Sequence, residues 1–115
     1  MSVLTNIALS SLGAAQTRLT VRAKNIANAS TPGYEPDQIV QISSPAGGTT
    51  ARGIPGRQGN YPQAGGSSGA APAPNKVNLA AEIVDLKLAE TSYKAALAVL
   101  KTAGELDRAA LEILA

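Results

Sequence analysis

The side chains that could act as general acids or bases occur as two close acidic pairs. Glu82 with Asp85, and Glu105 with Asp107, bring carboxylates near each other along the chain, and a carboxylate in a pocket can transfer protons. Both pairs fall in a long amphipathic stretch, where charged residues usually face solvent. The chain contains no His and no Cys, which removes imidazole catalysis, thiol nucleophiles, disulfides and Cys/His metal sites. We therefore expect no enzyme activity, no catalytic residue, no metal site and no cofactor.

The glycine-rich segment 53–59 is the other place where ligand chemistry could reside. It lacks the Lys-Ser/Thr ending of a phosphate-binding loop and does not lead into a helix. Arg52 and Arg57 would need neighbouring aromatic rings to bind RNA by stacking, and only Tyr61 is near. The net charge of +2 is too small to indicate nucleic acid by itself. We expect neither nucleic acid nor a small-molecule substrate as a partner.

The composition provides little material for a core within one chain. The 115 residues suffice for one domain, and 44% of them are apolar, but 22 are alanines and none is Phe or Trp. Aromatic side chains contribute strongly to core burial, and small domains bury a smaller fraction of their surface. We therefore expect this protein to gain stability from neighbouring molecules.

The first zone, residues 1–34, predicts a helix over 3–28 that ends in a tight turn. Ser2 or Thr5 suits the N-cap, and Pro32 disfavours helical backbone at the residue before it. Gly33 permits a positive φ, so residues 31–34 predict a type II turn. The apolar face of the helix consists of Leu4, Ala8, Leu12, Ala15, Leu19 and Ile26. Arg22 occupies the one remaining position on this face.

The middle zone, residues 35–75, predicts mostly extended or disordered chain. Residues 38–42, which are rich in Ile and Val, predict one short strand. After them the sequence is rich in Gly, Ser, Pro and Ala, which is the composition of a linker.

The last zone, residues 76–115, predicts one helix over 77–114 with Asn78 as its N-cap. At 1.5 Å per residue it would be about 55 Å long, against about 40 Å for the first helix. Its heptad seam is formed by the apolar residues Leu79, Ile83, Leu86, Tyr93, Leu97, Leu100, Leu111 and Leu114. Glu90, Gly104 and Asp107 occupy the remaining seam positions and weaken it. The predicted fold is therefore mostly α, an α-helical hairpin or coiled coil with the linker between its two helices.

Three further columns repeat every seven residues along the last zone. The first column holds small residues, namely Ala89, Ala96, Ala103 and Ala110. The second holds bases, namely Lys87, Lys94, Lys101 and Arg108. The third holds large aliphatic residues, namely Val99, Leu106 and Ile113. The basic column is most simply a solvated face. The widened apolar face needs more than one neighbouring helix, and the spacing fits either a helix in a larger assembly or a long coiled-coil dimer.

The end of the first helix resembles a signature of the flagellar rod and hook axial proteins, Asn-x-x-Asn-x-x-Thr-x-Gly-Tyr. The matching residues are Asn25, Asn28, Thr31, Gly33 and Tyr34, with Pro32 in the turn. Segments 82–86, 92–95 and 99–103 resemble the C-terminal part of the rod proteins, most closely the proximal-rod members. Gly104 and Glu105 replace the Lys or Gln usual in that family.

The resemblance implies a structural subunit of the bacterial flagellar basal-body rod. Such subunits are exported unfolded by the flagellar type III apparatus without a cleaved signal and polymerise by coiled-coil packing of their terminal helices. The rod crosses the periplasm and transmits torque. The implied partners are further copies, other rod subunits and the export apparatus, and no segment is apolar enough to span a membrane. The implied assembly interface consists of Leu4, Leu12, Leu19 and Ile26 with the eight apolar residues of the seam.

Two points stay open at the level of sequence. Asn25 and Asn28 are expected to end the first helix through side-chain hydrogen bonds to the backbone, whereas Tyr34 suits either a structural role or a solvated turn. A coiled-coil adaptor unrelated to the flagellum is the alternative function. Such an adaptor would not require the Asn-x-x-Asn-x-x-Thr-x-Gly-Tyr turn.

Overall fold

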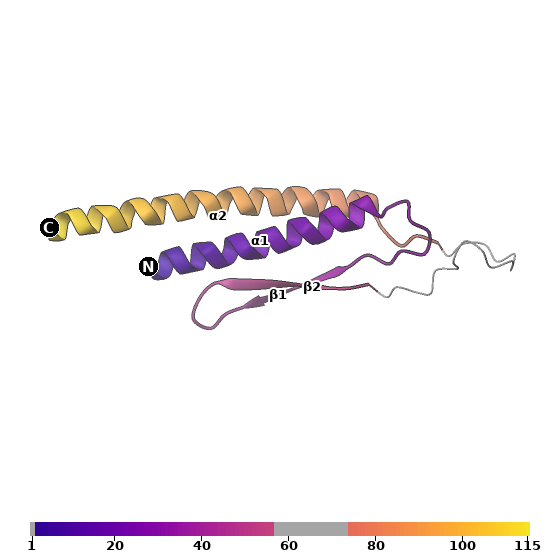
Figure 1. The fold of residues 1–115 in the computed structure, drawn as a ribbon, viewed down its shortest axis with the longest axis horizontal. Coiled ribbons are helices and arrows are strands. Elements are labelled where there is room, and N and C mark those ends of the chain that lie inside the picture. Colours follow the sequence, from indigo (N-terminus) through magenta and orange to yellow (C-terminus); the bar gives the residue numbers. More distant parts are fainter. Residues whose placement is uncertain (1, 57–73) are drawn as a thin grey trace, which may run out of the picture.

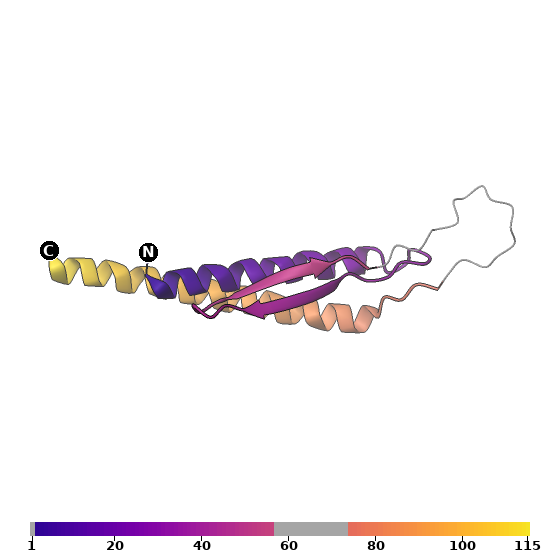
Figure 2. The same ribbon diagram turned by 90° about the horizontal axis from the view of Figure 1, so that it is seen from below.

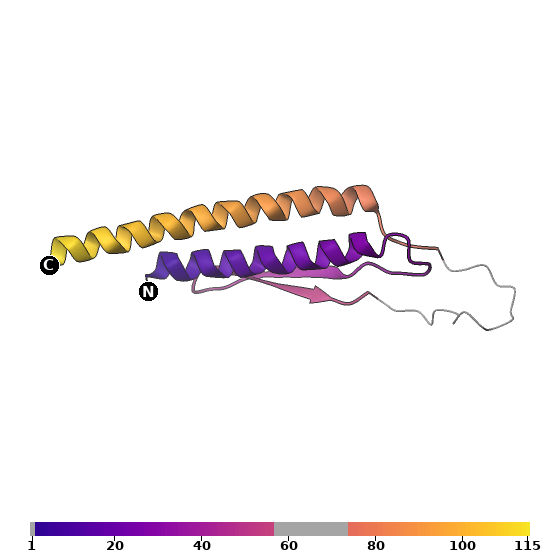
Figure 3. The ribbon, with the colours of Figure 1, turned by 45° about the horizontal axis from the view of Figure 1, so that its top comes forward.

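Two long helices and a β-hairpin make up the computed structural model, which describes residues 2–56 and 74–115. Helix α1 spans Val3–Ala27, strands β1 and β2 span Gln38–Ser43 and Thr49–Ile54, and helix α2 spans Leu79–Leu114. The helices run antiparallel, and α1 lies between α2 and the hairpin (Figures 1 and 3). The prediction of a mostly helical fold with two long terminal helices is confirmed.

Local side-chain chemistry fixes both ends of α1. The Ser2 hydroxyl accepts from the backbone N–H of Thr5 at 3.2 Å, so Ser2 is the N-cap. At the other end, the Asn28 amide donates to the Lys24 carbonyl at 2.9 Å. The chain then turns where the Tyr34 N–H donates to the Thr31 carbonyl at 3.3 Å, with φ of 73° at Gly33, as a type II turn requires.

Helix α2 is longer than its partner and continues past it. Asn78 caps its start by accepting from the backbone N–H of Ala81 at 3.2 Å, as the sequence predicts. The Thr5 hydroxyl, in the first turn of α1, donates to Asp107 at 3.4 Å. The segment of α2 that follows Asp107 therefore extends beyond the start of α1 (Figures 1 and 2).

The two helices pack through small side chains. The fully buried apolar residues of this interface are alanines at helical spacing, namely Ala8 and Ala15 on α1 and Ala89, Ala96 and Ala103 on α2. A methyl group lets two backbones approach closely but removes little apolar surface from water. The core is accordingly thin, as the composition indicates.

The hairpin corrects the prediction for the middle zone. Strands β1 and β2 pair antiparallel from Gln38 opposite Ile54 to Ser43 opposite Thr49, whereas the sequence predicts only one strand followed by linker. β2 is held by its ladder with β1 and by α1, where Ser10 accepts from the Thr49 N–H at 3.2 Å. Its own sequence has weak strand character because it includes Arg52 and Gly53. The remaining part of the predicted linker, 57–73, lies outside the described residues.

Candidate assembly site

A buried asparagine joins the three parts of the fold at one end of the molecule. Asn25 is 0% exposed. Its amide oxygen accepts from the Tyr34 hydroxyl at 3.1 Å and from the Asp37 N–H at 2.8 Å. Its amide nitrogen donates to the Asp37 carbonyl at 3.0 Å and to Glu82 at 3.2 Å. All four hydrogen-bonding positions of this side chain are therefore satisfied, and they link α1, the turn, the start of the hairpin and α2.

This result corrects the role predicted for Asn25. The sequence suggests that Asn25 ends α1 by bonding to nearby backbone, but its backbone partner is Asp37, twelve residues along the chain. Asn28 does act locally, as expected. Tyr34 is buried, with 4% of its surface exposed, so it is a structural residue and not a solvated turn residue. Periodicity alone could not reveal the role of Asn25, because its partners lie on other elements.

A cluster of charges surrounds Asn25 on the side of α2. Arg22 donates to both carboxylate oxygens of Glu82, at 3.2 and 3.1 Å, and pairs with Asp85 at 3.2 Å. Glu82 is buried, with 6% exposed, and a buried charge needs a partner of opposite sign. The acidic pair Glu82 and Asp85, considered above as a general acid and base, is thus bound to the guanidinium group of Arg22. This ion-pair cluster joins α1 to α2 at this end of the molecule.

A second ion pair closes the junction on the side of the hairpin. Lys24 lies 2.7 Å from Asp37, and the Gly56 N–H donates to the same carboxylate at 3.0 Å. Burial acts to raise the pKa of Asp37, but the hydrogen bonds from Lys24 and from Gly56 together outweigh it, so this pKa lies below its ordinary value. The hydrogen bond to Asp37 and the charge of that carboxylate raise the pKa of Lys24. Both groups are therefore charged at neutral pH.

The turn itself is tied to the segment that precedes α2. The Asn75 amide donates to the carbonyls of Asn28 and Thr31, and the Lys76 N–H donates to the Tyr34 carbonyl at 3.0 Å. The Thr31 hydroxyl donates to the Asn28 side chain at 3.2 Å. Each motif residue with a polar side chain thus holds a defined bond, and we name residues 25–34 with Arg22, Asp37 and Glu82 the motif junction.

Residues 6–34 match the protein family described as flagella basal body rod protein. The matched segment covers α1 from its first turn and all ten residues of the rod-protein motif, and it leaves β1, β2 and α2 outside. Proteins of the rod family are structural and not enzymatic. No curated protein matches the chain. The rod-protein motif is thus the same stretch of chain that forms the motif junction.

Most large aliphatic side chains of α2 are not covered by the described part of the chain. Buried positions on α2 recur at Glu82, Ala89, Ala96 and Ala103. The surface of α2 that faces α1 therefore consists of this column and of the adjacent half-buried column Leu86, Tyr93 and Leu100. Of the predicted interface, Leu86, Tyr93 and Leu100 on α2 and Leu12, Leu19 and Ile26 on α1 are half-buried, whereas Leu4, Leu79, Ile83, Leu97, Leu111 and Leu114 are exposed.

These residues are exposed because the observed interface between α1 and α2 is shifted relative to the predicted heptad seam. The sequence pattern pairs Leu86, Tyr93 and Leu100 with the column that holds Ile83 and Leu97. In the fold, the alanine column takes that place, because the small residues allow close approach of α1. The apolar residues displaced from the seam remain on the surface, where another molecule can reach them. Their role in assembly stays a prediction.

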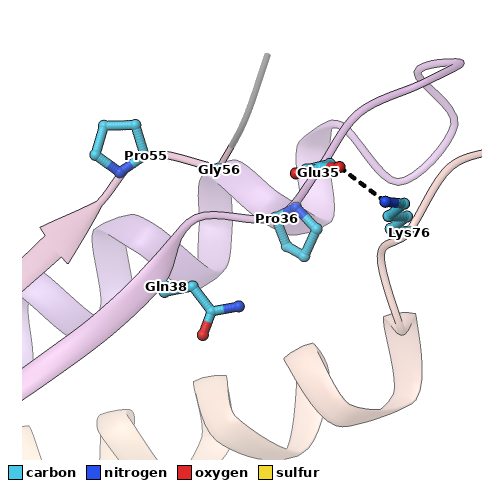
Figure 4. A pocket seen from close by; sticks show the side chains of 6 residues that line it. All are labelled: Glu35, Pro36, Gln38, Pro55, Gly56 and Lys76. Atoms are coloured by element: carbon cyan, nitrogen blue, oxygen red, sulfur yellow. Dashed lines mark hydrogen bonds and ion pairs between the residues drawn. The ribbon is translucent and has the colours of Figure 1, made fainter. Parts of the chain in front are cut away.

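The described surface offers little for small-molecule chemistry. A depression of about 390 Å³ is lined by Glu35, Pro36, Gln38, Pro55, Gly56 and Lys76. Lys76 and Glu35 pair at 2.8 Å across one side of it (Figure 4). Within residues 2–56 and 74–115, no cluster of side chains has the composition of a metal site. None of the described helices is apolar enough over a sufficient length to cross a bilayer.

Proposed function

We propose that this protein is a structural subunit of the bacterial flagellar basal-body rod that polymerises through α1 and α2. One observation carries the proposal: the motif that matches the rod family is folded into the motif junction, which ties α1, the hairpin and α2 together. A residue pattern that matched by chance would not be expected to place its Asn and Tyr in one buried network.

The apolar surface of α2 supports a role in polymerisation. Leu97 is 42% exposed and Leu111 is 69% exposed, and several other aliphatic residues of α2 are as accessible. Contiguous exposed apolar surface generally marks an interaction site. A thin alanine core inside the subunit, with larger side chains outside, is suited to a molecule whose main burial occurs on assembly.

The finer assignment follows from resemblance. The C-terminal segments most resemble the proximal-rod protein FlgC, and this resemblance supports an assignment to the proximal rod. In that role it is exported by the flagellar type III apparatus without a cleaved signal. It then assembles with its own copies and with other rod subunits, and the rod transmits torque across the periplasm.

A coiled-coil adaptor outside the flagellum is the competing function, and concentration-dependent circular dichroism with sedimentation separates the two. An adaptor forms a discrete, stable helical dimer at micromolar concentration. A rod subunit remains weakly associated when dilute and polymerises as its concentration rises. A discrete dimer that forms no filaments would count against the rod.

The decisive experiment images basal bodies. Deletion of the encoding sequence should leave basal bodies without a complete rod and cells that do not swim, and expression of the intact chain should restore both. Electron microscopy of purified basal bodies and a swimming assay measure the two outcomes. Complete rods in the deletion strain would refute the proposed function.

A further inference from the structure

Gly104 is an exposed glycine in the interior of α2 that nothing in the described chain requires. α2 continues through it without interruption, and a Cβ atom built on it would meet no other atom within 4 Å. A glycine lowers helix stability relative to alanine, so its presence calls for a compensating contact. Within the described chain no neighbour approaches it closely, so a contact that uses the missing side chain has to come from outside the described residues.

The residues around Gly104 form a notch. Leu97 and Leu111 stand seven residues before and after it on the same column, and they are 42% and 69% exposed. Seven residues correspond to about 10.5 Å along a helix. The column therefore presents two accessible leucines with a gap between them, and we call Leu97, Gly104 and Leu111 the notch column.

A complementary column lies on the other flank of α2. Val99, Leu106 and Ile113 have the same seven-residue spacing, and they are 43%, 57% and 84% exposed. No glycine interrupts them, so Leu106 is the central knob of an unbroken ridge. The two columns flank the buried column Ala89, Ala96 and Ala103 at opposite sides. We call Val99, Leu106 and Ile113 the ridge column.

We infer that the notch column of one copy receives the ridge column of a second copy, with Leu106 seated against Gly104 between Leu97 and Leu111. This inference rests on the proposed function and specifies the contact through which copies associate. Equal spacing lets three pairs of positions meet at once, and the missing side chain at Gly104 provides space for the leucine. Both columns adjoin the α1–α2 interface and extend its packing outward to the next copy.

The arrangement has a consequence for the type of assembly. Notch and ridge are different surfaces on opposite flanks of one helix, so the contact is heterologous. A heterologous contact leaves a free notch on one copy and a free ridge on the other after each addition. It therefore gives a ring or an open helical polymer and not a two-fold dimer.

Filling the notch provides the first test. G104L in the full chain should keep the helical content of the unmodified protein, because the site is open and the substitution replaces glycine in a helix. It should raise the concentration at which assembly begins at least about tenfold, as judged by sedimentation velocity. A98L is the matched control, since it adds the same side chain at an exposed position of α2 outside both columns, and it should assemble like the unmodified chain. Unchanged assembly of G104L overturns the inference.

Mixing two variants tests the heterologous contact itself. G104L keeps the ridge and loses the notch, whereas L106D keeps the notch and loses the ridge. Each alone should be monomeric, and an equimolar mixture should form a one-to-one dimer that grows no further. A mixture that stays monomeric, or variants that each dimerise alone, overturn the inference. If the unmodified chain associates only with other rod subunits and never with itself, the inference fails while the rod function stands; if it associates with neither, both fail.

Discussion

Asn25 illustrates how one polar residue can determine the geometry of a whole subunit. Its side-chain amide forms hydrogen bonds with the turn, with the residue that precedes β1 and with α2. Asn is suited to this position because it offers two donors and two acceptors in one plane. Asp would remove both donors and place a second negative charge beside the buried Glu82.

The first prediction concerns this residue. N25A removes the hydrogen bonds that Asn25 makes with the Tyr34 hydroxyl, the Asp37 backbone and Glu82, and the loss of buried hydrogen bonds is costly. We expect a loss of roughly 2–4 kcal/mol in the free energy of unfolding, measured by denaturant titration of the dilute chain. N28A is the control, and we expect it to cost about 1 kcal/mol or less because the bonds of that side chain are local, to Lys24 and Thr31. Equal losses for the two variants would contradict the role of Asn25 as the residue that ties the motif junction together.

The second prediction concerns pH and the ion pair between Lys24 and Asp37. Folding lowers the pKa of Asp37, so its contribution is present above the ordinary carboxyl pKa of about 4 and is lost as pH falls through the lower folded value. Folding raises the pKa of Lys24, so that contribution is lost only when pH rises above about 10.4. D37N should therefore be less stable than the unmodified chain at neutral pH, and the difference should shrink toward about pH 2.

Thermal unfolding of both proteins over this pH range gives the required comparison. Other carboxylates titrate in the same range, so the difference between the two proteins is the informative quantity. A difference that stays constant from neutral to acid pH would show that the charge of Asp37 does not stabilise the junction.

At the scale of the element, α1 is covered on two sides and α2 on one. α1 lies between α2 and the hairpin (Figure 3), and its buried residues include Ala14 and Val21 besides the alanines that face α2. On the hairpin side, a Cβ atom built on Gly53 would lie 3.0 Å from the Val21 side chain. α2 has no second partner within the described chain, which explains why its aliphatic residues are so much more exposed.

The third prediction tests the alanine interface. A89L adds a large side chain at a position that is 0% exposed, where α1 and α2 approach closely. Overpacking of this kind should destabilise the chain by about 1–3 kcal/mol, measured by thermal unfolding. A98L makes the same change on the exposed face and should alter stability by no more than about 0.5 kcal/mol. A stable A89L chain would mean that the helices separate at little cost.

At the scale of the whole molecule, the distribution of side chains is that of a part and not of a complete globule. Small residues occupy the interior, and the larger aliphatics of α2 lie on its surface, increasingly so toward Leu114, which is 84% exposed. The segment of α2 beyond Asp107 has no described α1 residue opposite it (Figures 1 and 2). Nothing in the described part of the chain covers these residues.

The fourth prediction separates folding from assembly at this scale. L97D places a charge on a residue that is 42% exposed in the single chain, so the unfolding temperature of the dilute chain should change little. In an assembled interface the same carboxylate would be buried without a partner, which is strongly unfavourable, and assembly should be abolished. Cells that carry only L97D should not swim.

K94A is the matched control because Lys94 lies on the solvated column and pairs with Glu90 in its own helix. Folding lowers the pKa of Glu90 through its hydrogen bond with Lys94, but an exposed i,i+4 ion pair contributes little to stability because solvent screens it. K94A cells should swim normally. Normal swimming by L97D cells would contradict the predicted role of Leu97 in assembly.

Local chemistry in the sequence determined the two helices, their ends and the turn after α1. Ser2 and Asn78 cap the helices, Pro32 and Gly33 form the turn, and the periodicity of apolar residues defines α1 and α2. These features depend on residues within a few positions of one another, so the sequence expresses them directly. The matches to the rod-protein motif are likewise read from consecutive residues.

Tertiary structure alone decided which residues meet across elements. Strand β2 exists because β1 and α1 hold it, and the positive φ of Gly47 and Gly48, at 90° and 94°, lets the chain turn between the two strands. The burial of Asn25 and the replacement of half the leucine seam by alanines depend on the relative rotation of two helices. A heptad pattern leaves that rotation open when small and large residues occupy adjacent columns, because either column can face the partner and only packing in three dimensions selects one.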